Sequence, residues 1–389
     1  MINLAVFFGS RSVEHEVSII TALQTILTLK ENNNLNIQPI YIDKTGDWYT
    51  GDNLLEIDNF KNIKKVIANS QKINFVRENG KTYIVKSPLP TLRKGIISQV
   101  DMAFPIIHGS YGEDGSLQGF FEHMQIPYIG SSVLASATTM DKIITKLILK
   151  SSGVNVVDSV WFSADEWLND SNKCIKLVED NLDYPLIIKP SDIGSSIGVK
   201  VVKSKKEVED AVNFVRKFSN RILAEKMIQN MREINISVLG DSEEVELSVC
   251  EEPISDDEFL TFDNKYNSNG SSTKGMSSAK REIPAKLTET EKNTIETMAK
   301  ESFRALNLSG LCRIDFIMDT KEKKIYVNEF NTIPGSLAFY LWEATNKSFL
   351  EVLNTLIKLS SKKERNEAML IRTNKSNILS GVKLGGLKK

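Results

Sequence analysis

The sequence predicts a fold of mixed α/β and α+β type. It should have an N-terminal doubly wound parallel sheet, a small central lid domain and a C-terminal antiparallel-sheet domain. Three patterns support this: strand, helix and strand within residues 4–42, two strands around a serine- and glycine-rich loop within 186–202, and a polar hairpin within 311–335. A length of 389 residues exceeds one typical hydrophobic core and indicates two or three domains.

The composition limits the class of protein. Hydrophobic residues make up 41% and charged residues 25%, as expected of a soluble globular protein. A formal net charge of -1 gives no electrostatic reason to expect nucleic acid or a membrane surface as partner. Three scattered cysteines indicate neither a disulfide framework nor a zinc site. Without a signal peptide pattern or an apolar stretch of about 18 residues, the expected location is cytoplasmic.

The N-terminal domain should begin with a βαβ unit, which places its first two strands parallel in one sheet. Gly9 supplies the tight turn after the first strand, and the loop H-G-S-Y-G-E-D-G begins at His108. The region 43–98 looks like an elaboration on the sheet, with a helix and a hairpin. The expected elements are strand 4–8, helix 14–30, strand 37–42, helix 60–69, hairpin strands 72–76 and 81–85, strand 100–107 and helix 116–124.

The remaining elements should form the lid and the C-terminal domain. One helix over 131–152 is expected to carry M-D-K and to stop at Gly153. After Lys362 the chain turns basic and loses helical periodicity, so it should fray. The other expected elements are strands 186–189, 198–202, 222–226, 233–239 and 244–251, a mobile polar loop over 267–280, and helices 288–306 and 348–361. The predicted domains are 1–132, 133–223 and 224–375, followed by a basic tail, 376–389.

The hairpin within 311–335 carries the strongest chemical pattern. Arg313 and Asp315 share one face of the first strand, and Glu329 and Asn331 share one face of the second. Two carboxylates and an amide suit Mg²⁺, and a guanidinium can hold a phosphate or a developing oxyanion. The alternative is an amphipathic hairpin with a solvated polar face. Its apolar neighbours disfavour that interpretation, because polar groups in a buried hairpin need partners.

A second pattern is the loop K-P-S-D-I-G-S-S-I-G-V-K, residues 189–200. Its backbone N–H groups can wrap phosphate oxygens while Lys189 adds a charge, although no Walker A spacing occurs in the chain. The alternative is a plain hairpin turn. Lys142, Glu225 and Lys226 lie near the same lid; taken singly, such residues are usually solvated. Together with the hairpin, they would enclose a nucleoside triphosphate between two sheets.

These motifs occur in a particular order along residues 4–359. The order is S-V-E-H-E-V-S, H-G-x-x-G-E-D-G, M-D-K, K-P-x-x-x-G-S-S-x-G, E-K, K-Y, R-I-D and N-E-x-N-T-x-P-G. This series resembles the D-alanine–D-alanine ligases of the ATP-grasp superfamily. The resemblance implies an ATP-grasp fold and an enzyme that joins two D-alanine molecules through an acyl phosphate, releasing ADP and phosphate, for peptidoglycan precursor synthesis. It also implies small amino acid substrates and a homodimer.

The resemblance assigns roles residue by residue. The residues implied to bind ATP are Lys142, Lys189, Ser196, Glu225, Lys226, Ile228, Glu233 and Lys265. Those implied to hold two Mg²⁺ (or Mn²⁺) ions are Asp315, Glu329 and Asn331. Glu14 would receive the ammonium of the first amino acid with Ser195 and Tyr266, while Arg313 and the N–H of Gly335 would stabilise the oxyanion. The remaining candidates for substrate contact are His108, Tyr340 and Leu341. His108 is alternatively a structural histidine.

One segment departs from the family pattern. After P-G the family continues to His-Ser-Leu, with the serine helping to hold the carboxylate of the acceptor, but this chain has Phe339 and Tyr340 before the retained Leu341. An acceptor other than D-alanine is therefore one alternative, although Tyr266 disfavours a hydroxy acid. A non-catalytic nucleotide-binding relative is a second alternative. An ATP-grasp carboxylase, or a synthetase for a larger carboxylate, is a third alternative, which the two N-terminal motifs disfavour.

Overall fold

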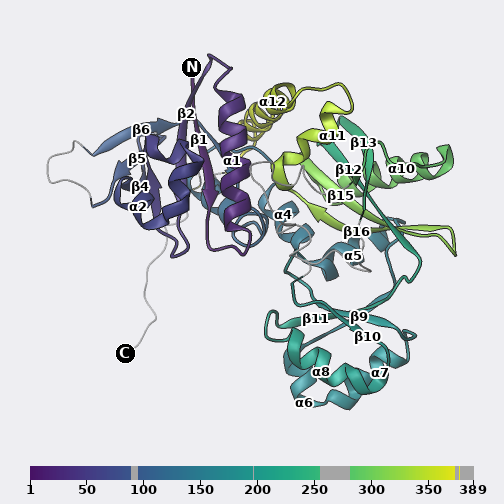
Figure 1. Cartoon of the computed structure of the whole chain (residues 1–389). Coiled ribbons are helices and arrows are strands. Elements are labelled where there is room, and N and C mark those ends of the chain that lie inside the picture. Colours follow the sequence, from purple (N-terminus) through teal and green to yellow (C-terminus); the bar gives the residue numbers. More distant parts are fainter. Residues whose placement is uncertain (89–94, 196, 255–280, 373–375, 377–389) are drawn as a thin grey trace, which may run out of the picture.

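The computed structural model describes residues 1–88, 95–195, 197–254, 281–372 and 376. The predictions for Ser196, Lys265, Tyr266, the loop 267–280 and the end of the tail lie outside these residues. Figure 1 shows three parts: the N-terminal sheet, the C-terminal sheet beside it, and the lid below the C-terminal sheet.

The N-terminal sheet has the strand order β6-β5-β4-β3-β2-β1-β7. Its parallel part is β2-β1-β7, and α1 crosses from β1 to β2, which confirms the βαβ unit. The strands beyond β2 are antiparallel, so the predicted elaboration extends the same sheet. The strands are β1 (Ile2–Gly9), β2 (Leu35–Ile42), β3 (Trp48–Thr50), β4 (Gln71–Glu78), β5 (Lys81–Lys86), β6 (Ile96–Val100) and β7 (Met102–Ile106). The helices are α1 (His15–Leu29), η1 (Asp52–Leu55), η2 (Ile57–Asn62), α2 (Ile63–Ala68) and α3 (Ser116–Met124).

The central strand β1 is apolar throughout because both of its faces are covered. Leu4, Val6 and Phe8 point into one hydrophobic cluster, and Ala5 and Phe7 point into another. Side chains alternate along a strand, so a strand covered on both faces has a continuous apolar run. The expected strand over 100–107 divides at Asp101 into β6 and β7, because β6 pairs with β5 and β7 pairs with β1.

The single helix predicted over 131–152 is wrong. The structure has two helices, α4 (Val133–Met140) and α5 (Lys142–Ser151), which are separated by Asp141. The Asp141 carboxylate accepts hydrogen bonds from the N–H groups of Ile143 and Ile144 and so begins α5. Aspartate favours this N-cap position over a helix interior, which explains the break. Gly153 has a φ of +79°, in agreement with the predicted stop.

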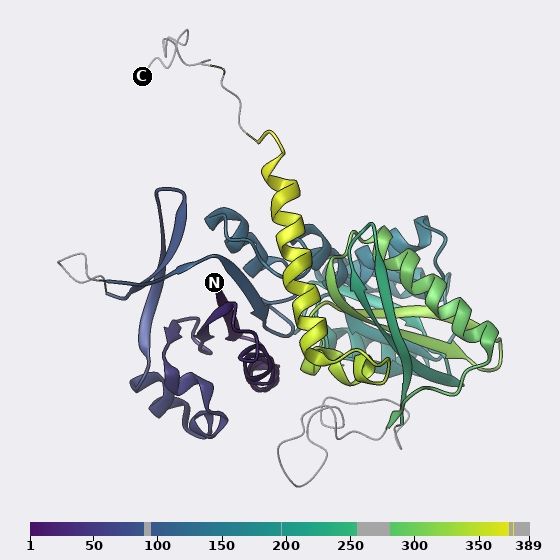
Figure 2. The ribbon, with the colours of Figure 1, turned by 90° about the horizontal axis from the view of Figure 1, so that it is seen from above.

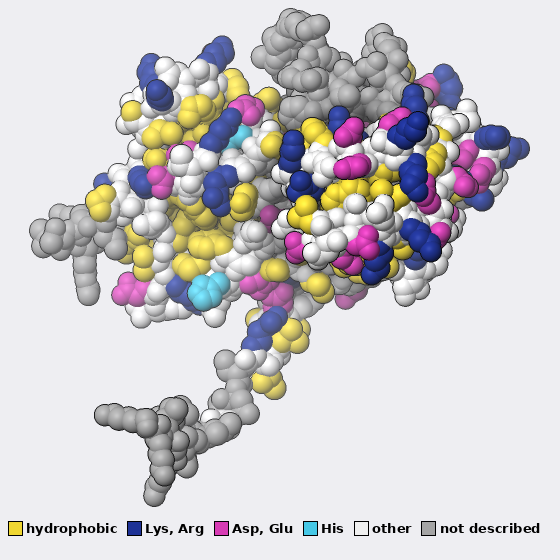
Figure 3. All heavy atoms as spheres, turned by 90° about the horizontal axis from the view of Figure 1, so that it is seen from below, with side chains coloured by type: hydrophobic (Ala, Val, Ile, Leu, Met, Phe, Trp, Pro, Cys, Tyr) yellow, Lys and Arg dark blue, Asp and Glu magenta, His cyan; other side chains and the backbone are white. Residues whose placement is uncertain are grey.

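The lid is a four-stranded antiparallel sheet with helices packed on one face (Figure 1). Its strand order is β10-β9-β11-β8, and β11 belongs entirely to this sheet. The elements are β8 (Ser159–Ser163), α6 (Ala164–Asn169), α7 (Ser171–Glu179), β9 (Leu186–Pro190), β10 (Lys200–Val202), α8 (Lys205–Val215) and β11 (Arg221–Lys226). Seen from below, its helical face carries charged side chains of both signs, interspersed with hydrophobic ones (Figure 3).

The C-terminal sheet has the order β14-β13-β12-β15-β16. Ile234, Ile236, Ile314 and Phe316 point into a hydrophobic cluster with α10, so the alternate residues of β12 and β15 lie on the opposite face. The elements are β12 (Met231–Gly240), β13 (Val245–Pro253), β14 (Arg281–Glu282), α10 (Glu289–Ala305), β15 (Gly310–Asp319), β16 (Lys324–Asn331), η4 (Gly335–Ala338), α11 (Phe339–Glu343) and α12 (Phe349–Ala368).

The long helix α12 lies between the N-terminal and C-terminal parts (Figure 2). Its buried residues Leu353 and Leu356 share one hydrophobic cluster with Leu4 of β1. The predicted loss of helical structure after Lys362 is wrong, since α12 continues to Ala368. Lys362 pairs with Asp241 and Glu243 at 2.7 Å each, which fixes this turn to the C-terminal domain. No helix within the described part of the chain has the length and apolar character needed to cross a membrane.

Candidate active site

A pocket lies between the lid sheet and the C-terminal sheet. Residues from β9, β11 and α5 line one side, and residues from β12, β15 and β16 line the other. The predicted site residues that it brings together are Lys142, Lys189, Glu225, Lys226, Ile228, Glu233, Asp315 and Glu329. The arrangement agrees with the predicted enclosure of a ligand between two sheets.

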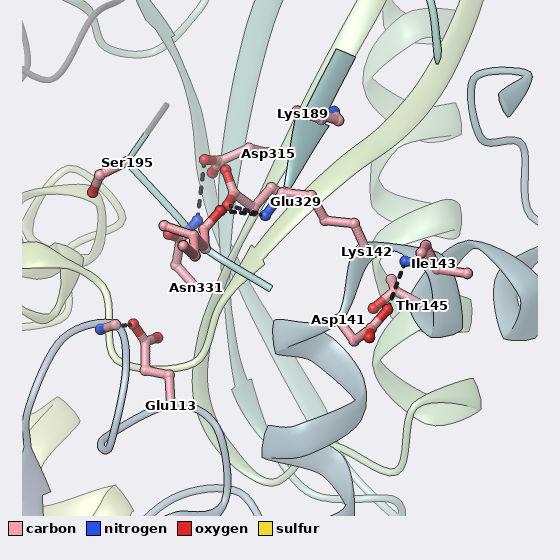
Figure 4. Close-up of polar contacts among 12 residues, drawn as sticks. Glu113, Asp141, Lys142, Ile143, Thr145, Lys189, Ser195, Asp315, Glu329 and Asn331 are labelled. Carbon is pink, nitrogen blue, oxygen red and sulfur yellow. Dashed lines mark hydrogen bonds and ion pairs between the residues drawn. The ribbon is translucent and has the colours of Figure 1, made fainter. Parts of the chain in front are cut away.

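The polar hairpin forms one wall of this pocket (Figure 4). Arg313 pairs across the strands with Asn331, and Asp315 pairs with Glu329. Nε and Nη2 of Arg313 donate to the two carboxylate oxygens of Asp315 at 2.7 and 2.8 Å, and Nδ2 of Asn331 donates to Asp315 at 3.1 Å. Asp315 is 2% and Arg313 is 7% exposed, so the interpretation as a solvated polar face is wrong.

Electrostatics keeps the buried guanidinium of Arg313 protonated. Burial disfavours the charged guanidinium of Arg313, but Asp315 outweighs burial and raises the pKa of Arg313 well above its ordinary value. The bidentate geometry is the strong form of an arginine–carboxylate contact. The pair therefore holds the guanidinium of Arg313 in a fixed orientation beside the pocket.

The hairpin has the ligand chemistry of a magnesium site. Asp315 and Glu329 supply carboxylate oxygens and Asn331 an amide oxygen, in adjacent positions on two paired strands. Mg²⁺ is commonly held by one or two carboxylates, with water and substrate phosphates completing its shell. Among the described residues there is no group of three or more histidine, cysteine, aspartate or glutamate side chains arranged for a metal. Two carboxylates and an amide fit a Mg²⁺ ion whose remaining ligands are water and phosphate oxygens.

Lys142 links the lid loop to the β15–β16 hairpin (Figure 4). As the first residue of α5, it places its ammonium 3.4 Å from Oε1 of Glu329 and donates to the carbonyl of Ile193 at 2.9 Å. Its backbone N–H donates to the carbonyl of Ser191. The Asp141 cap therefore sets the position from which Lys142 reaches into the pocket.

Glu225 lies between two lysines at the inner end of the pocket. Lys146 is 2.7 Å and Lys189 is 3.0 Å from its carboxylate. Burial alone would raise the pKa of Glu225, but the two lysines outweigh burial and lower the pKa to about 2. Burial lowers the pKa of Lys146, and Glu225 opposes that shift. Lys146 is not among the predicted site residues, although it stands four residues after Lys142 on the same face of a helix.

A contact between the N-terminal part and the lid defines the other end of the site. The hydroxyl of Ser195 donates to Oε1 of Glu14 at 2.6 Å, across 181 positions of sequence. Ser195 has a φ of +57°, a left-handed conformation that is uncommon for a residue with a side chain. The backbone N–H of Glu14 donates to the Ser12 hydroxyl at 3.1 Å. The predicted pair for the first amino acid is thus brought together.

His108 supports the loop that contains Gly335. Its Nδ1 lies 2.5 Å from the carbonyl of Ile333, and its Nε2 lies 2.9 Å from the Thr21 hydroxyl, which accepts a hydrogen bond from the N–H of Ser336. Burial lowers the pKa of His108. Both ring nitrogens are engaged within the protein, so these contacts favour the structural alternative for His108.

Glu113 is a second support of this loop. It accepts hydrogen bonds from the N–H groups of Gly109 and Ile333 at 2.8 and 2.7 Å, and from Thr332 at 3.2 Å. Burial raises the pKa of Glu113 to about 8, although these N–H groups favour the ionised form. Glu113 is not among the predicted site residues, although its place in the motif H-G-x-x-G-E-D-G indicates a role in this loop.

The segment that departs from the family pattern forms α11. The Tyr340 hydroxyl donates to Oε1 of Glu251 at 3.0 Å, and the guanidinium carbon of Arg281 lies 4.3 Å from the centre of the Tyr340 ring. Leu341 is fully buried. The substrate contacts of Tyr340 and Leu341 stay predictions.

Comparisons with known proteins agree with this architecture. Residues 3–131 match the model of the D-ala D-ala ligase N-terminus, and residues 148–358 match that of the D-ala D-ala ligase C-terminus. A D-alanine–D-alanine ligase of Thermosipho melanesiensis is 41% identical over 360 residues, which cover 92% of this chain and 93% of that protein. One of Natranaerobius thermophilus is 36% identical and covers 94% and 97%.

Two solved structures have similar folds. The D-alanine–D-alanine ligase of Coxiella burnetii superposes with a TM-score of 0.78 at 28% identity, covering 95% of this chain and 97% of that one. The VanG D-Ala:D-Ser ligase of Enterococcus faecalis gives a TM-score of 0.77 at 29% identity, covering 92% and 99%. The lid and the C-terminal sheet that enclose the pocket define the ATP-grasp fold. The chain belongs to the D-alanine–D-alanine ligase family.

Proposed function

We propose that this protein joins two D-alanine molecules in an ATP-dependent reaction that releases the dipeptide, ADP and phosphate. The observation that supports it most is the convergence of Lys142, Lys189, Asp315 and Glu329 on one pocket between two sheets. Curated relatives at 34–41% identity are named D-alanine–D-alanine ligases. Their names favour D-alanine as acceptor over the altered-acceptor alternative and over a non-catalytic role. The product would serve peptidoglycan precursor synthesis.

The nucleotide would lie between the lid and the hairpin. Lys142 and Lys189 would neutralise its phosphates, with Ser196 in the phosphate loop and Lys265 over the phosphates. The residues assigned to adenine and ribose are Glu225, Lys226, Ile228 and Glu233. Two Mg²⁺ (or Mn²⁺) ions held by Asp315, Glu329 and Asn331 would neutralise charge on the phosphoryl groups during transfer.

The amino acids would lie between the nucleotide and the N-terminal part. Glu14, oriented by Ser195 and with Tyr266 nearby, would bind the ammonium of the first amino acid, whose carboxylate is phosphorylated. The amine of the second amino acid attacks the acyl phosphate, and phosphate leaves as the peptide bond forms. Arg313 and the N–H of Gly335 would stabilise the oxyanion of the tetrahedral intermediate. Enclosure of the site keeps water from the acyl phosphate.

Three further assignments belong to this proposal. The proposed domains are 1–132, 133–223 and 224–375, with a basic tail at 376–389; β11 of the lid sheet extends across the boundary at 223. The protein is a homodimer, as the family resemblance implies, and light scattering after size-exclusion chromatography tests that. The location is cytoplasmic, which agrees with three buried cysteines that form no disulfide.

The test is a product analysis with purified protein, ATP, MgCl₂ and D-alanine. The expected result is ADP, phosphate and D-alanyl-D-alanine in equal amounts, with no dipeptide from L-alanine. D-Serine and D-lactate in place of the acceptor test the altered-acceptor alternative. ATP turnover without any dipeptide, or no turnover at all, would contradict the proposed function.

A further inference from the structure

Three side chains form a buried cluster beside the hairpin, which we name the Glu251 cluster: Glu251, Tyr340 and Arg281. Glu251 of β13 is 2% exposed. Its Oε1 accepts hydrogen bonds from the Tyr340 hydroxyl at 3.0 Å and from Nδ2 of Asn235 at 3.2 Å, and its Oε2 accepts from Nη1 of Arg281 at 2.9 Å. Arg281 also stacks on the ring of Tyr340. The cluster thus holds a guanidinium in a defined orientation.

The Glu251 cluster lies in line with the polar residues of the hairpin, in one row of cross-strand neighbours. Glu329 pairs with Asp315, Asp315 with Asn235, and Asn235 with Glu251, in register over four strands. Neighbouring strands in a sheet are about 4.8 Å apart. Glu251 on β13 is two strands from Asp315 on β15, so their backbones are about 10 Å apart. The metal ligands stand at one end of this row and the cluster with Arg281 at the other.

The cluster also borders the reaction centre. Tyr340 follows Gly335 by five residues, and α11 packs against β13 and β12. Tyr340 and Glu251 both contribute to the raised pKa of Arg313. A substrate that reaches Arg313 from the side away from the phosphates therefore lies next to the Glu251 cluster.

The charge of the acceptor amino acid decides which way it points. Its amine must approach the acyl phosphate, while its carboxylate is repelled by the phosphates. The carboxylate therefore turns toward the opposite end of the row. Arg313 already donates Nε and Nη2 to Asp315, whereas Arg281 brings a second guanidinium to that end.

Tyr340 does not supply the hydrogen bond that a serine would at its position. Its hydroxyl hydrogen goes to Glu251, and burial together with the Glu251 charge raises the pKa of Tyr340, so the phenol keeps its proton. The ring instead packs against the face of the Arg281 guanidinium. A planar guanidinium with five N–H donors matches a carboxylate better than a hydroxyl does.

We propose that Arg281, oriented by Glu251 and Tyr340, binds the carboxylate of the acceptor amino acid. The inference rests on the proposed function and adds a residue that selects the second substrate. Glu251 and Tyr340 are positioning residues in this account, because they act through the guanidinium. Holding Arg281 in place before binding lowers the entropy cost of that contact.

The test is a competition between two acceptors, D-alanine and D-alaninamide. The amide lacks a free carboxylate, so it cannot be phosphorylated and can act only as acceptor. Mass spectrometry of the two products gives the ratio of D-alanyl-D-alanine to D-alanyl-D-alaninamide. This ratio is independent of the amount of folded enzyme. The wild-type protein is expected to favour D-alanine strongly.

Arg281→Gln should lower this ratio by about 10- to 100-fold, as expected for a hydrogen-bonded charge contact. Arg281→Lys keeps the charge and should lower the ratio less. Tyr340→Phe and Glu251→Gln should fall between Arg281→Gln and the wild type. Arg304→Gln, an exposed arginine of α10, is the matched control and should leave the ratio unchanged.

The outcomes separate the two proposals. If the wild-type protein forms no dipeptide from D-alanine, the proposed function fails. If it forms the dipeptide and Arg281→Gln keeps the wild-type ratio, the proposed function stands and the role of Arg281 is refuted.

Discussion

Lys146 and Lys189 hold one buried carboxylate, and this contact has a larger energetic effect than any surface ion pair. The side chains of Lys146 and Glu225 are 6% and 2% exposed. Removing one member of a buried pair leaves a charge that is less well compensated, which typically costs about 3–5 kcal/mol. Lys189 still pairs with Glu225, so the lower end of that range applies.

Lys146→Met should therefore lower the free energy of unfolding by about 3 kcal/mol, measured by urea denaturation. The control is Lys150→Met, one turn further along α5, where a half-exposed lysine lies 3.6 Å from Asp158. An exposed pair of this kind contributes at most about 1 kcal/mol. Equal losses in the two variants would contradict the special role of Lys146.

Glu113 gives the stability a definite pH dependence. Burial raises its pKa from 4.5 to about 8 in the folded state. Between these values the folded protein keeps a proton that the unfolded chain has lost, so the Glu113 contribution to stability falls as the pH rises. It is fully present below about pH 4.5 and is lost as the pH rises through 8.

Glu113→Gln should remove this contribution. We expect the wild-type free energy of unfolding, taken relative to that of Glu113→Gln, to be higher at pH 5 than at pH 8. Urea denaturation of both proteins at the two pH values measures it, and the subtraction cancels the groups that they share. Parallel pH dependence of the two proteins would show that Glu113 does not titrate in this range.

At the scale of elements, the break between α4 and α5 positions a functional lysine. The carboxylate of Asp141 caps α5 and also pairs with Arg221 of β11. Lys142 follows directly and reaches Glu329. The break therefore connects the lid strand β11, the start of α5 and the β15–β16 hairpin.

Asp141→Ala should lower the free energy of unfolding by about 1 kcal/mol, because the N-cap of α5 is lost. It should also raise the KM for ATP several-fold, because the first turn of α5 no longer holds Lys142 in position. Asp141→Asn keeps a capping oxygen but loses the charge contact with Arg221, so its effect should be smaller. Ser132→Ala removes the cap of the neighbouring α4 and should lower stability without changing the KM for ATP. Equal KM values in all three variants would contradict the role of the break.

The sequence predicts helices and strands well where the hydrophobic periodicity and the residues that end an element, such as glycine, agree. The hairpin of β15 and β16 was predictable because apolar alternation fixed both its strands and the shared face of Arg313 and Asp315. The break at Asp141 was missed because the apolar pattern runs through it, although aspartate favours an N-cap. The last turns of α12 were missed because the ion pairs of Lys362 come from distant residues.

At the scale of the whole molecule, the site is assembled from three parts of the chain. Glu14 comes from the N-terminal part, Ser195 from the lid and Asp315 from the C-terminal sheet. The N-terminal and C-terminal parts share a hydrophobic cluster that includes α12, so they support each other directly. The lid joins them through α5 and β11.

This assembly sets the limit of prediction from sequence alone. Nothing in the residues themselves places Ser195 beside Glu14, and only the family resemblance indicated that contact. Lys146, Glu113 and Glu251 were missed because a charged residue is normally solvated and only tertiary packing buries it. Their roles follow from their partners, which lie far away in the sequence.

The central claim is that the β15–β16 hairpin binds the metal ions that position ATP against the lid. The most direct measurement is the rate of D-alanyl-D-alanine and ADP formation by Glu329→Gln at saturating ATP, Mg²⁺ and D-alanine. Glu301→Gln, an exposed glutamate of α10, is the control and should keep the wild-type rate. The account predicts a loss of at least about 100-fold in Glu329→Gln, since one of two carboxylate ligands is removed. A wild-type rate in Glu329→Gln would contradict it.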